Sequence, residues 1–232
     1  MNFSKIKKAY FIGVKGVGMT GLAQVLKGRG IEVLGSDTQE RFFTDEVLKK
    51  LKIKVFQGFN FKNIPLDADL IVVSSAYGEN NPEIKFALER GQKIYSYSDI
   101  LAELFKESYG LGVAGTHGKT TTTAMLGRVL EGLGLDPTVI VGSKVLEWGS
   151  NARVGSSKYF VAELDEYQAK FLKYRLKILI LTNIEYDHPD FFKNFKEYKK
   201  VFFQLVSQLP KDGLLVGCKD DKTIRKIAQK AP

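Results

Sequence analysis

Short apolar runs alternate with helix-length segments from one end of the chain to the other. The apolar runs predict strands at 9–12, 31–34, 54–56, 70–74, 93–95, 109–114, 159–162, 177–181 and 213–217. The intervening segments predict helices that end near residue 29, span 82–90 and 98–107, follow a second glycine loop, and span 194–209 and 222–230. This alternation predicts an α/β fold of mostly parallel sheets and is incompatible with an all-α or an all-β fold.

Composition favours a folded protein of a reducing compartment. With 44% hydrophobic residues the 232-residue chain can bury a real core, and its single cysteine, Cys218, excludes an intramolecular disulfide. No apolar run approaches the roughly 18 residues of a membrane span, so we expect a soluble, cytoplasmic protein without membrane insertion. The net charge of +9 comes from scattered lysines. Such scatter predicts solvated faces and no nucleic-acid partner, but it suits anionic nucleotides.

A first glycine loop lies between the strand at 9–12 and the helix that follows. Gly13, Gly16 and Gly18 are placed so that backbone amides and the helix dipole could receive a diphosphate. Lys15 stands where a nicotinamide site has its second glycine, and its side chain could contact the diphosphate or point to water. Asp37, after the second strand, could bond a ribose or base edge or cap a helix. A plain βα turn and a dinucleotide dehydrogenase are the alternatives.

A second and more specific loop, AGTHGKTT, occupies residues 114–121. The strand before it and the helix after it predict a phosphate loop in which Lys119 spans the β- and γ-phosphates of ATP and Thr120 holds Mg²⁺. The loop departs from the usual spacing because Val113 stands at the position of the first glycine. A chance GKT tripeptide is the alternative, and the flanking strand and helix argue against it.

Acidic and histidine residues follow two later strands. Glu163 follows the strand at 159–162, and the segment NIEYDH at 183–188 follows the strand at 177–181. Ligands bind at strand carboxyl ends in open α/β sheets, and Mg²⁺ prefers oxygen ligands. The two histidines of the chain, His117 and His188, lie in the phosphate loop and in this acidic segment. That placement favours a functional role over a purely structural one.

Two domains are predicted, because the strand at 109–114 begins a new glycine loop and a new long helix. Residues 1–106 would form a Rossmann-like doubly wound domain, and residues 107–232 a P-loop ATP-binding α/β domain. The second sheet has about four predicted strands, a stage at which parallel sheets usually continue. We therefore expect the second domain to be incomplete.

These motifs resemble those of the Mur ligases, which add amino acids to the UDP-linked peptidoglycan precursor. The resemblance covers essentially all 232 residues and is most specific in the first glycine loop and at 35–37, 74–76, 114–123 and 183–188. Within the family the chain is most similar to the branch that joins L-alanine to UDP-N-acetylmuramate, at 134–138, 149–153 and 209–213. The resemblance implies an ATP-dependent, amide-bond-forming ligase of peptidoglycan synthesis.

The resemblance also implies roles for individual residues. The sugar carboxylate would take the γ-phosphate of ATP, and the amine of an amino acid would attack the resulting acyl phosphate. Thr120 and Glu163 would bind Mg²⁺, and His188, supported by Asn183, would help to hold a second metal. The residues implied around ATP are Gly115, Thr116, His117, Gly118, Lys119, Thr120 and Thr121. Those implied around the UDP-sugar are Gly13, Lys15, Gly16, Val17, Gly18, Ser36, Asp37, Ser74 and Ser75.

Some positions depart from the family pattern. Lys15 replaces a glycine, Phe59 stands at a histidine position and Leu164 at an alanine position. Residues 165–167 are more similar to a branch that attaches a whole tripeptide to the same UDP-sugar, which is the alternative ligase. The family's C-terminal ligase domain is missing, so we expect the chain to be inactive alone, with that domain as a partner in cis or in trans. A nucleotide-binding module without catalysis and a nicotinamide oxidoreductase are further alternatives.

Overall fold

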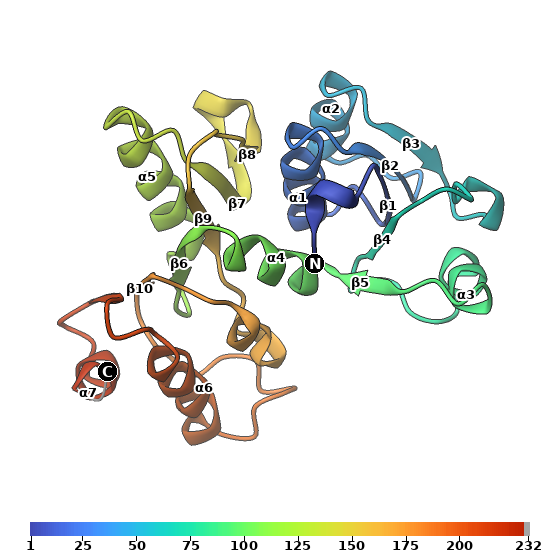
Figure 1. Ribbon diagram of the computed structural model, residues 1–232. Helices are drawn as coiled ribbons and strands as arrows, with labels where there is room; N and C mark the ends of the chain where they lie inside the picture. The colour runs from blue at the N-terminus through green and yellow to red at the C-terminus, as the bar shows by residue number, and fades with distance from the viewer. Residues whose placement is uncertain (230–232) are drawn as a thin grey trace. The chain divides into compact units, whose positions relative to one another are not determined.

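The computed structural model describes residues 1–229 and contains two β-sheets with flanking helices (Figure 1). Contacts group these residues into two compact units. The first unit combines Met1–Leu101 with Gly142–Val154, and the second comprises the remaining described residues. The sequence predicts one domain boundary, after residue 106. The grouping by contacts differs in that it begins the second unit at Ala102 and places Gly142–Val154 in the first. No helix in the described part of the chain is long and apolar enough to cross a membrane.

The first unit is built on a five-stranded parallel sheet with the strand order β3-β2-β1-β4-β5. Its strands are β1 (Lys8–Ile12), β2 (Glu32–Asp37), β3 (Lys54–Gln57), β4 (Leu70–Val73) and β5 (Ile94–Ser96). In the central strand, Ile12 lies opposite Ser36 of β2 and Val73 of β4. The loops that leave these three strands therefore meet at one edge of the sheet, where ligands bind in such folds.

The helices of the N-terminal half are α1 (Val17–Gly28), α2 (Phe43–Lys50), α3 (Pro82–Glu89) and α4 (Tyr97–Lys106). α3 begins where Asn81 accepts backbone hydrogen bonds from Glu83 and Ile84, with proline at a tolerated first-turn position. Its Ile84 packs into a buried apolar cluster with Tyr10 of β1. Helix α2 was not predicted, because it is short and five of its eight residues are polar or charged.

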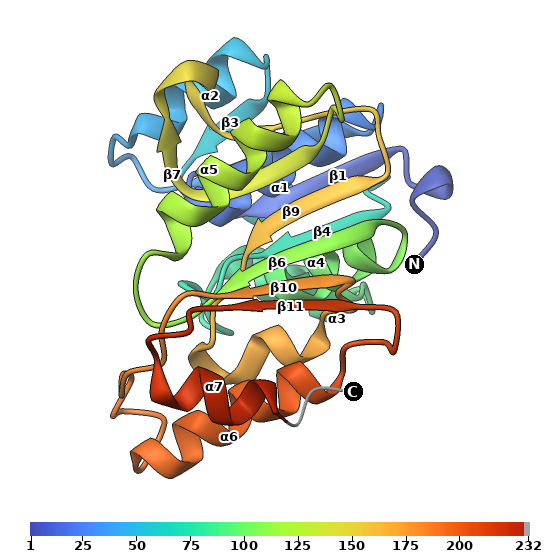
Figure 2. The ribbon, with the colours of Figure 1, turned by 90° about the vertical axis from the view of Figure 1, so that its left-hand side faces the viewer.

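The second sheet has six strands in the order β11-β10-β6-β9-β7-β8. These are β6 (Tyr109–Ala114), β7 (Thr138–Val145), β8 (Ser150–Arg153), β9 (Tyr159–Glu163), β10 (Ile178–Leu181) and β11 (Leu214–Gly217). The helices here are α5 (Lys119–Gly132), α6 (Phe195–Ser207) and α7 (Lys222–Ala228). Figure 2 shows β6, β10 and β11 side by side, with α6 and α7 together on one face of that end of the sheet. The helix predicted over 222–230 corresponds to α7, and the predicted end at Lys230 lies outside the described residues.

Each predicted strand is present, and the α/β fold is confirmed. The expectation of about four strands in the second sheet is wrong, because a hairpin formed by β7 and β8 adds two. Its two strands are joined through a short 3-10 turn, Leu146–Trp148. The hairpin was not predicted because its strands do not form apolar runs: the second half of β7 is mostly exposed, and β8 buries the polar residues Ser150 and Asn151.

Candidate active site

The second glycine loop connects β6 to α5, as its sequence predicts. Gly118 precedes the helix with a φ of 77°, and Gly115 has a φ of 136°. A Cβ atom on Gly115 would lie 2.1 Å from the Thr182 hydroxyl oxygen and 2.8 Å from the main-chain oxygen of Asn183. Both glycines are therefore needed, one for left-handed backbone and the other for close approach to the turn after β10.

That turn holds the first half of the loop. The amide of Thr116 donates to the main-chain oxygen of Asn183 at 3.0 Å, and the amide of His117 donates to the Asn183 side-chain oxygen at 2.8 Å. The Thr182 hydroxyl donates to the main-chain oxygen of His117 at 2.6 Å. Asn183 thus shapes the loop directly. The amides of the first turn of α5 lack intrahelical acceptors, as in any helix, and amides of this kind can donate to anions.

The ammonium of Lys119 is enclosed by protein oxygens. It donates to the main-chain oxygens of Gly115 at 2.7 Å and Thr116 at 3.2 Å, and it lies 3.1 Å from a carboxylate oxygen of Glu166. The Glu166 side chain is only 1% exposed. Sequence reasoning did not select Glu166, although it stands three positions after Glu163 in the same acidic segment.

Thr120 and Glu163, two of the predicted metal ligands, are in contact. The Thr120 hydroxyl donates to the Glu163 carboxylate at 3.0 Å, and Glu163 is the last residue of β9. A hydroxyl and a carboxylate at the carboxyl edge of a parallel sheet form an oxygen pair of the kind that Mg²⁺ prefers.

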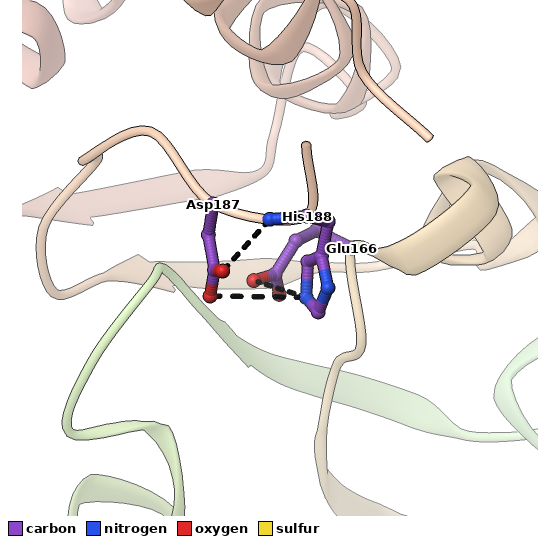
Figure 3. A group of neighbouring side chains, drawn as sticks. All are labelled: Glu166, Asp187 and His188. Carbon is purple, nitrogen blue, oxygen red and sulfur yellow. Dashed lines mark hydrogen bonds and ion pairs between the residues drawn. The ribbon is translucent and has the colours of Figure 1, made fainter. Parts of the chain in front are cut away.

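His188, the third predicted metal ligand, lies beside Glu166 and Asp187 (Figure 3). Its Nε2 atom is 3.7 Å from a Glu166 oxygen and 3.9 Å from an Asp187 oxygen. One potential ligand atom from each of these three residues lies within 4.8 Å of the others. The backbone of His188 has a φ of 55° and its amide donates to Asp187, so the turn itself aims the ring. Two carboxylates and an imidazole are a donor set that fits a divalent cation.

Tyr198 of α6 links the acidic group to the phosphate loop. Its hydroxyl is 3.1 Å from Glu166 Oε1 and 3.0 Å from the Thr116 hydroxyl, and the whole residue is buried. Burial and the nearby Glu166 carboxylate raise the pKa of Tyr198 far above its ordinary value. The phenol therefore stays protonated. Tyr198 was not predicted, because a tyrosine on an amphipathic helix looks like an ordinary core residue.

The other predicted nucleotide residues take several positions. Thr116 is tied to Glu185 by two hydrogen bonds of 2.9 Å, one from its hydroxyl to the main-chain oxygen and one from the Glu185 amide to its hydroxyl oxygen. His117 is exposed, with its ring nitrogen 3.8 Å from the Glu185 carboxylate. Thr121 is an exposed residue of the first turn of α5.

The first glycine loop is organised by Asp37. One oxygen of its carboxylate accepts the amide of Lys15 at 2.7 Å, and the other accepts the Tyr77 hydroxyl at 2.9 Å. Burial and this hydrogen bond raise the pKa of Tyr77 to about 12. The Tyr77 ring also comes so close to Gly13, which has a φ of 84°, that a Cβ there would lie 2.5 Å from it. Tyr77 was not predicted.

Lys15 does not point to water. Its side chain is 2% exposed, and its ammonium contacts the main-chain oxygens of Thr38 at 2.9 Å and Glu40 at 2.8 Å and the Asp45 carboxylate at 3.0 Å. These three acceptors match the three hydrogens of an ammonium. The side chain therefore fastens the segment after β2, and direct contact with a diphosphate would require it to release one partner.

The remaining residues predicted around the UDP-sugar lie at the same edge of the first sheet. Gly16 precedes α1, and Val17 and Gly18 are its first two residues. Ser74 and Ser75 follow β4, and Ser75 is exposed. The Ser36 hydroxyl is buried and donates to the Glu83 carboxylate, so it faces the protein interior.

Comparison with known proteins covers both parts of the chain. The Mur ligase family catalytic domain matches residues 8–109, and the Mur ligase middle domain matches residues 113–232. The UDP-N-acetylmuramate–L-alanine ligase of Borrelia garinii subsp. bavariensis is 40% identical over 232 residues, which cover 98% of this chain and 50% of that protein. The ligase of the same name from Desulfitobacterium hafniense is 44% identical over 224 residues, 96% of this chain and 49% of that protein. The chain thus spans about half the length of these curated relatives.

Two solved structures share the fold at similar levels of sequence identity. UDP-N-acetylmuramate:L-alanyl-gamma-D-glutamyl-meso-diaminopimelate ligase from Neisseria meningitidis superposes with a TM-score of 0.87 at 32% identity, over 97% of this chain and 75% of that one. UDP-N-acetylmuramate–alanine ligase from Thermotoga maritima superposes with a TM-score of 0.86 at 30% identity, over 95% of this chain and 51% of that one. On the matches of both family domains and of these relatives, the chain belongs to the Mur ligase family.

Proposed function

We propose that this chain supplies the UDP-sugar-binding and ATP-binding parts of a ligase that joins L-alanine to UDP-N-acetylmuramate in peptidoglycan synthesis. The observation that carries the proposal is the phosphate loop with Lys119 in it and the Thr120–Glu163 pair beside it. The names of the curated relatives support the choice of substrates. Such a ligase would work in the cytoplasm, where ATP and UDP-linked sugars are found.

The chemistry of such a ligase suits these residues. Transfer of the γ-phosphate of ATP to a sugar carboxylate brings two anions together, so positive charge and precise placement matter more than a protein nucleophile. Lys119 would orient the phosphates and the loop amides would hold their oxygens. Thr120 and Glu163 would hold Mg²⁺, and His188 with its acidic neighbours would hold a second divalent cation. Bound there, the metal would supply charge neutralisation for phosphoryl transfer.

The partners follow from the same proposal. The first glycine loop, together with the ends of β2 and β4, would bind the UDP part of UDP-N-acetylmuramate, while the amino acid would be held largely by residues outside this chain. Because the chain spans about half of its relatives, the C-terminal ligase domain would act with it in cis or in trans. We expect no nucleic-acid partner.

A second candidate is the ligase that attaches a tripeptide to the same UDP-sugar. The structural match to the Neisseria ligase, at a TM-score of 0.87, favours it as much as the Thermotoga match favours the first. Both candidates share UDP-N-acetylmuramate and ATP. They are distinguished by which amine, L-alanine or the tripeptide, is incorporated once the C-terminal ligase domain is supplied.

The direct test is Lys119→Ala, examined by calorimetry with Mg²⁺-ATP. We expect ATP binding to be lost while the fold is kept, since the lysine ammonium supplies charge to the phosphates. Lys119→Arg should restore binding only in part, because a planar guanidinium does not fit where a compact ammonium sits. Lys211→Ala, an exposed lysine of the same unit, is the matched control. Unchanged ATP affinity in Lys119→Ala would refute the phosphate-loop assignment.

A further inference from the structure

The Lys119 ammonium has no hydrogen left for a phosphate. It has three hydrogens, and the main-chain oxygens of Gly115 and Thr116 and the carboxylate of Glu166 accept them. If Lys119 is to orient the phosphates of a nucleotide, it must release at least one of these acceptors. The two main-chain oxygens belong to the loop itself, so Glu166 is the acceptor that can be exchanged for phosphate without reshaping the loop.

Releasing Glu166 has an electrostatic cost, because its carboxylate is only 1% exposed. A buried carboxylate that loses its cation is strongly destabilised unless other donors remain. The structure provides one such donor, the hydroxyl of Tyr198 at 3.1 Å from Glu166 Oε1. The His188 ring nitrogen, at 3.7 Å, lies outside hydrogen-bond distance but close enough to approach.

The hydrogen positions around Tyr198 favour this arrangement. The Tyr198 hydroxyl has a single hydrogen and two oxygen neighbours, Glu166 and the Thr116 hydroxyl. Thr116 can give its own hydrogen to the Tyr198 hydroxyl oxygen at 3.0 Å, in place of the main-chain oxygen of Glu185. The hydrogen of Tyr198 is then available to Glu166, where an ionised acceptor makes the stronger bond.

We propose that Glu166 is a positioning residue that holds the Lys119 ammonium until a phosphate replaces it, and that the hydrogen bond from Tyr198 makes release easier by stabilising the Glu166 carboxylate. The proposal rests on the proposed ATP-binding function. Glu166 competes with phosphate for the ammonium of Lys119. The hydrogen bond from Tyr198 stabilises the Glu166 carboxylate and so weakens this competition.

The test measures binding of ATP and of inorganic tripolyphosphate in the presence of EDTA, so that metal plays no part. Glu166→Gln should bind both about three- to tenfold more tightly than the wild type, because the amide no longer holds the ammonium by charge. Tyr198→Phe should bind both about two- to fivefold more weakly, because Glu166 then depends more on Lys119. The double variant should behave like Glu166→Gln, since Tyr198 acts through Glu166. Asp165→Asn, the exposed acid next to Glu166, is the matched control and should bind as the wild type does.

A residue with a merely structural role would weaken binding in both single variants. Equal or weaker binding by Glu166→Gln, with the control unchanged, therefore overturns the proposal while leaving the phosphate-loop assignment intact. The assignment fails separately if Lys119→Ala binds as the wild type does.

If no variant binds polyphosphate, thermal unfolding without nucleotide tests whether Glu166 holds Lys119. The pair Lys119→Met and Glu166→Gln is compared with the double variant in thermal unfolding. If Glu166 holds Lys119, the double variant should be more stable than Lys119→Met alone, since the neutral amide removes the stranded carboxylate. Additive effects would overturn the proposal.

Discussion

The buried Lys15 side chain connects the first glycine loop to the segment that follows β2. Its ammonium is held by the main-chain oxygens of Thr38 and Glu40 and by the Asp45 carboxylate, and it is 2% exposed. We expect Lys15→Met to lower the free energy of unfolding by about 1–3 kcal/mol, because one carboxylate and two carbonyls lose their cation. Urea unfolding measures the change, and Lys49→Met, an exposed lysine of α2, is the control.

The same substitution separates two roles for Lys15. If its part in substrate binding is indirect, a UDP ligand should bind Lys15→Met only a few-fold more weakly once unfolding is accounted for. A loss of UDP binding with unchanged stability would instead mean that the Lys15 ammonium releases its protein acceptors and contacts the diphosphate.

Residue types with a fixed spacing could be predicted from the sequence, and those selected by tertiary contact could not. Lys119 and Thr120 were predicted as site residues because a phosphate loop needs them directly at the start of a helix. Glu166 has the same side chain as any surface glutamate, and only the fold buries it beside Lys119. Tyr77 and Tyr198 resemble core aromatics, since their hydroxyls meet acids far away in sequence, 40 positions away for Tyr77 and 32 for Tyr198.

The β7–β8 hairpin is fastened to α1 by buried polar side chains. Gln24 of α1 donates to the Asn151 side-chain oxygen at 3.1 Å and accepts from the Ser150 hydroxyl at 2.6 Å. Asn151 is fully buried and donates to the main-chain oxygen of Val17 at 2.7 Å. Val17 is the first residue of α1, directly after the first glycine loop. The hairpin thus supports the helix end that would face a diphosphate.

Asn151→Ala tests this support. We expect it to lower the free energy of unfolding by about 1–3 kcal/mol, because Gln24 and the Val17 carbonyl lose a buried partner. Hydrogen exchange should quicken at the start of α1 and in residues 145–154 while the central strand β1 stays protected. Asn80→Ala, at an exposed loop position, should change neither quantity. Exchange that stays slow at both places in Asn151→Ala would contradict the role of the hairpin.

Elements with a continuous apolar run were predictable, and this hairpin was not. β1, β4 and β9 are buried along nearly their whole length and stand out in the sequence. β8 buries a serine and an asparagine, which become acceptable in a core only through Gln24, more than a hundred positions earlier. A local pattern cannot contain that information, because the satisfaction of a buried polar group is a property of the folded chain.

At the scale of the whole chain, the second sheet ends in an exposed apolar strand. β11 pairs with β10 on one side and is last in the strand order over the described residues. Leu214 and Val216 of this strand are 53% and 46% exposed. An edge strand with apolar side chains and open backbone groups is a template for pairing with another chain.

We therefore expect this chain to self-associate as its concentration rises, through β11. Val216→Lys should reduce the association, because a charged side chain on an edge strand blocks pairing between sheets. Sedimentation velocity over a concentration series measures the effect. Met125→Lys is the matched control, since Met125 is 64% exposed but lies on α5, where no backbone edge is open. If Met125→Lys suppresses association and Val216→Lys does not, an apolar helix surface drives it. If the sedimentation coefficient of the wild type does not change with concentration, β11 does not drive self-association and the prediction is wrong.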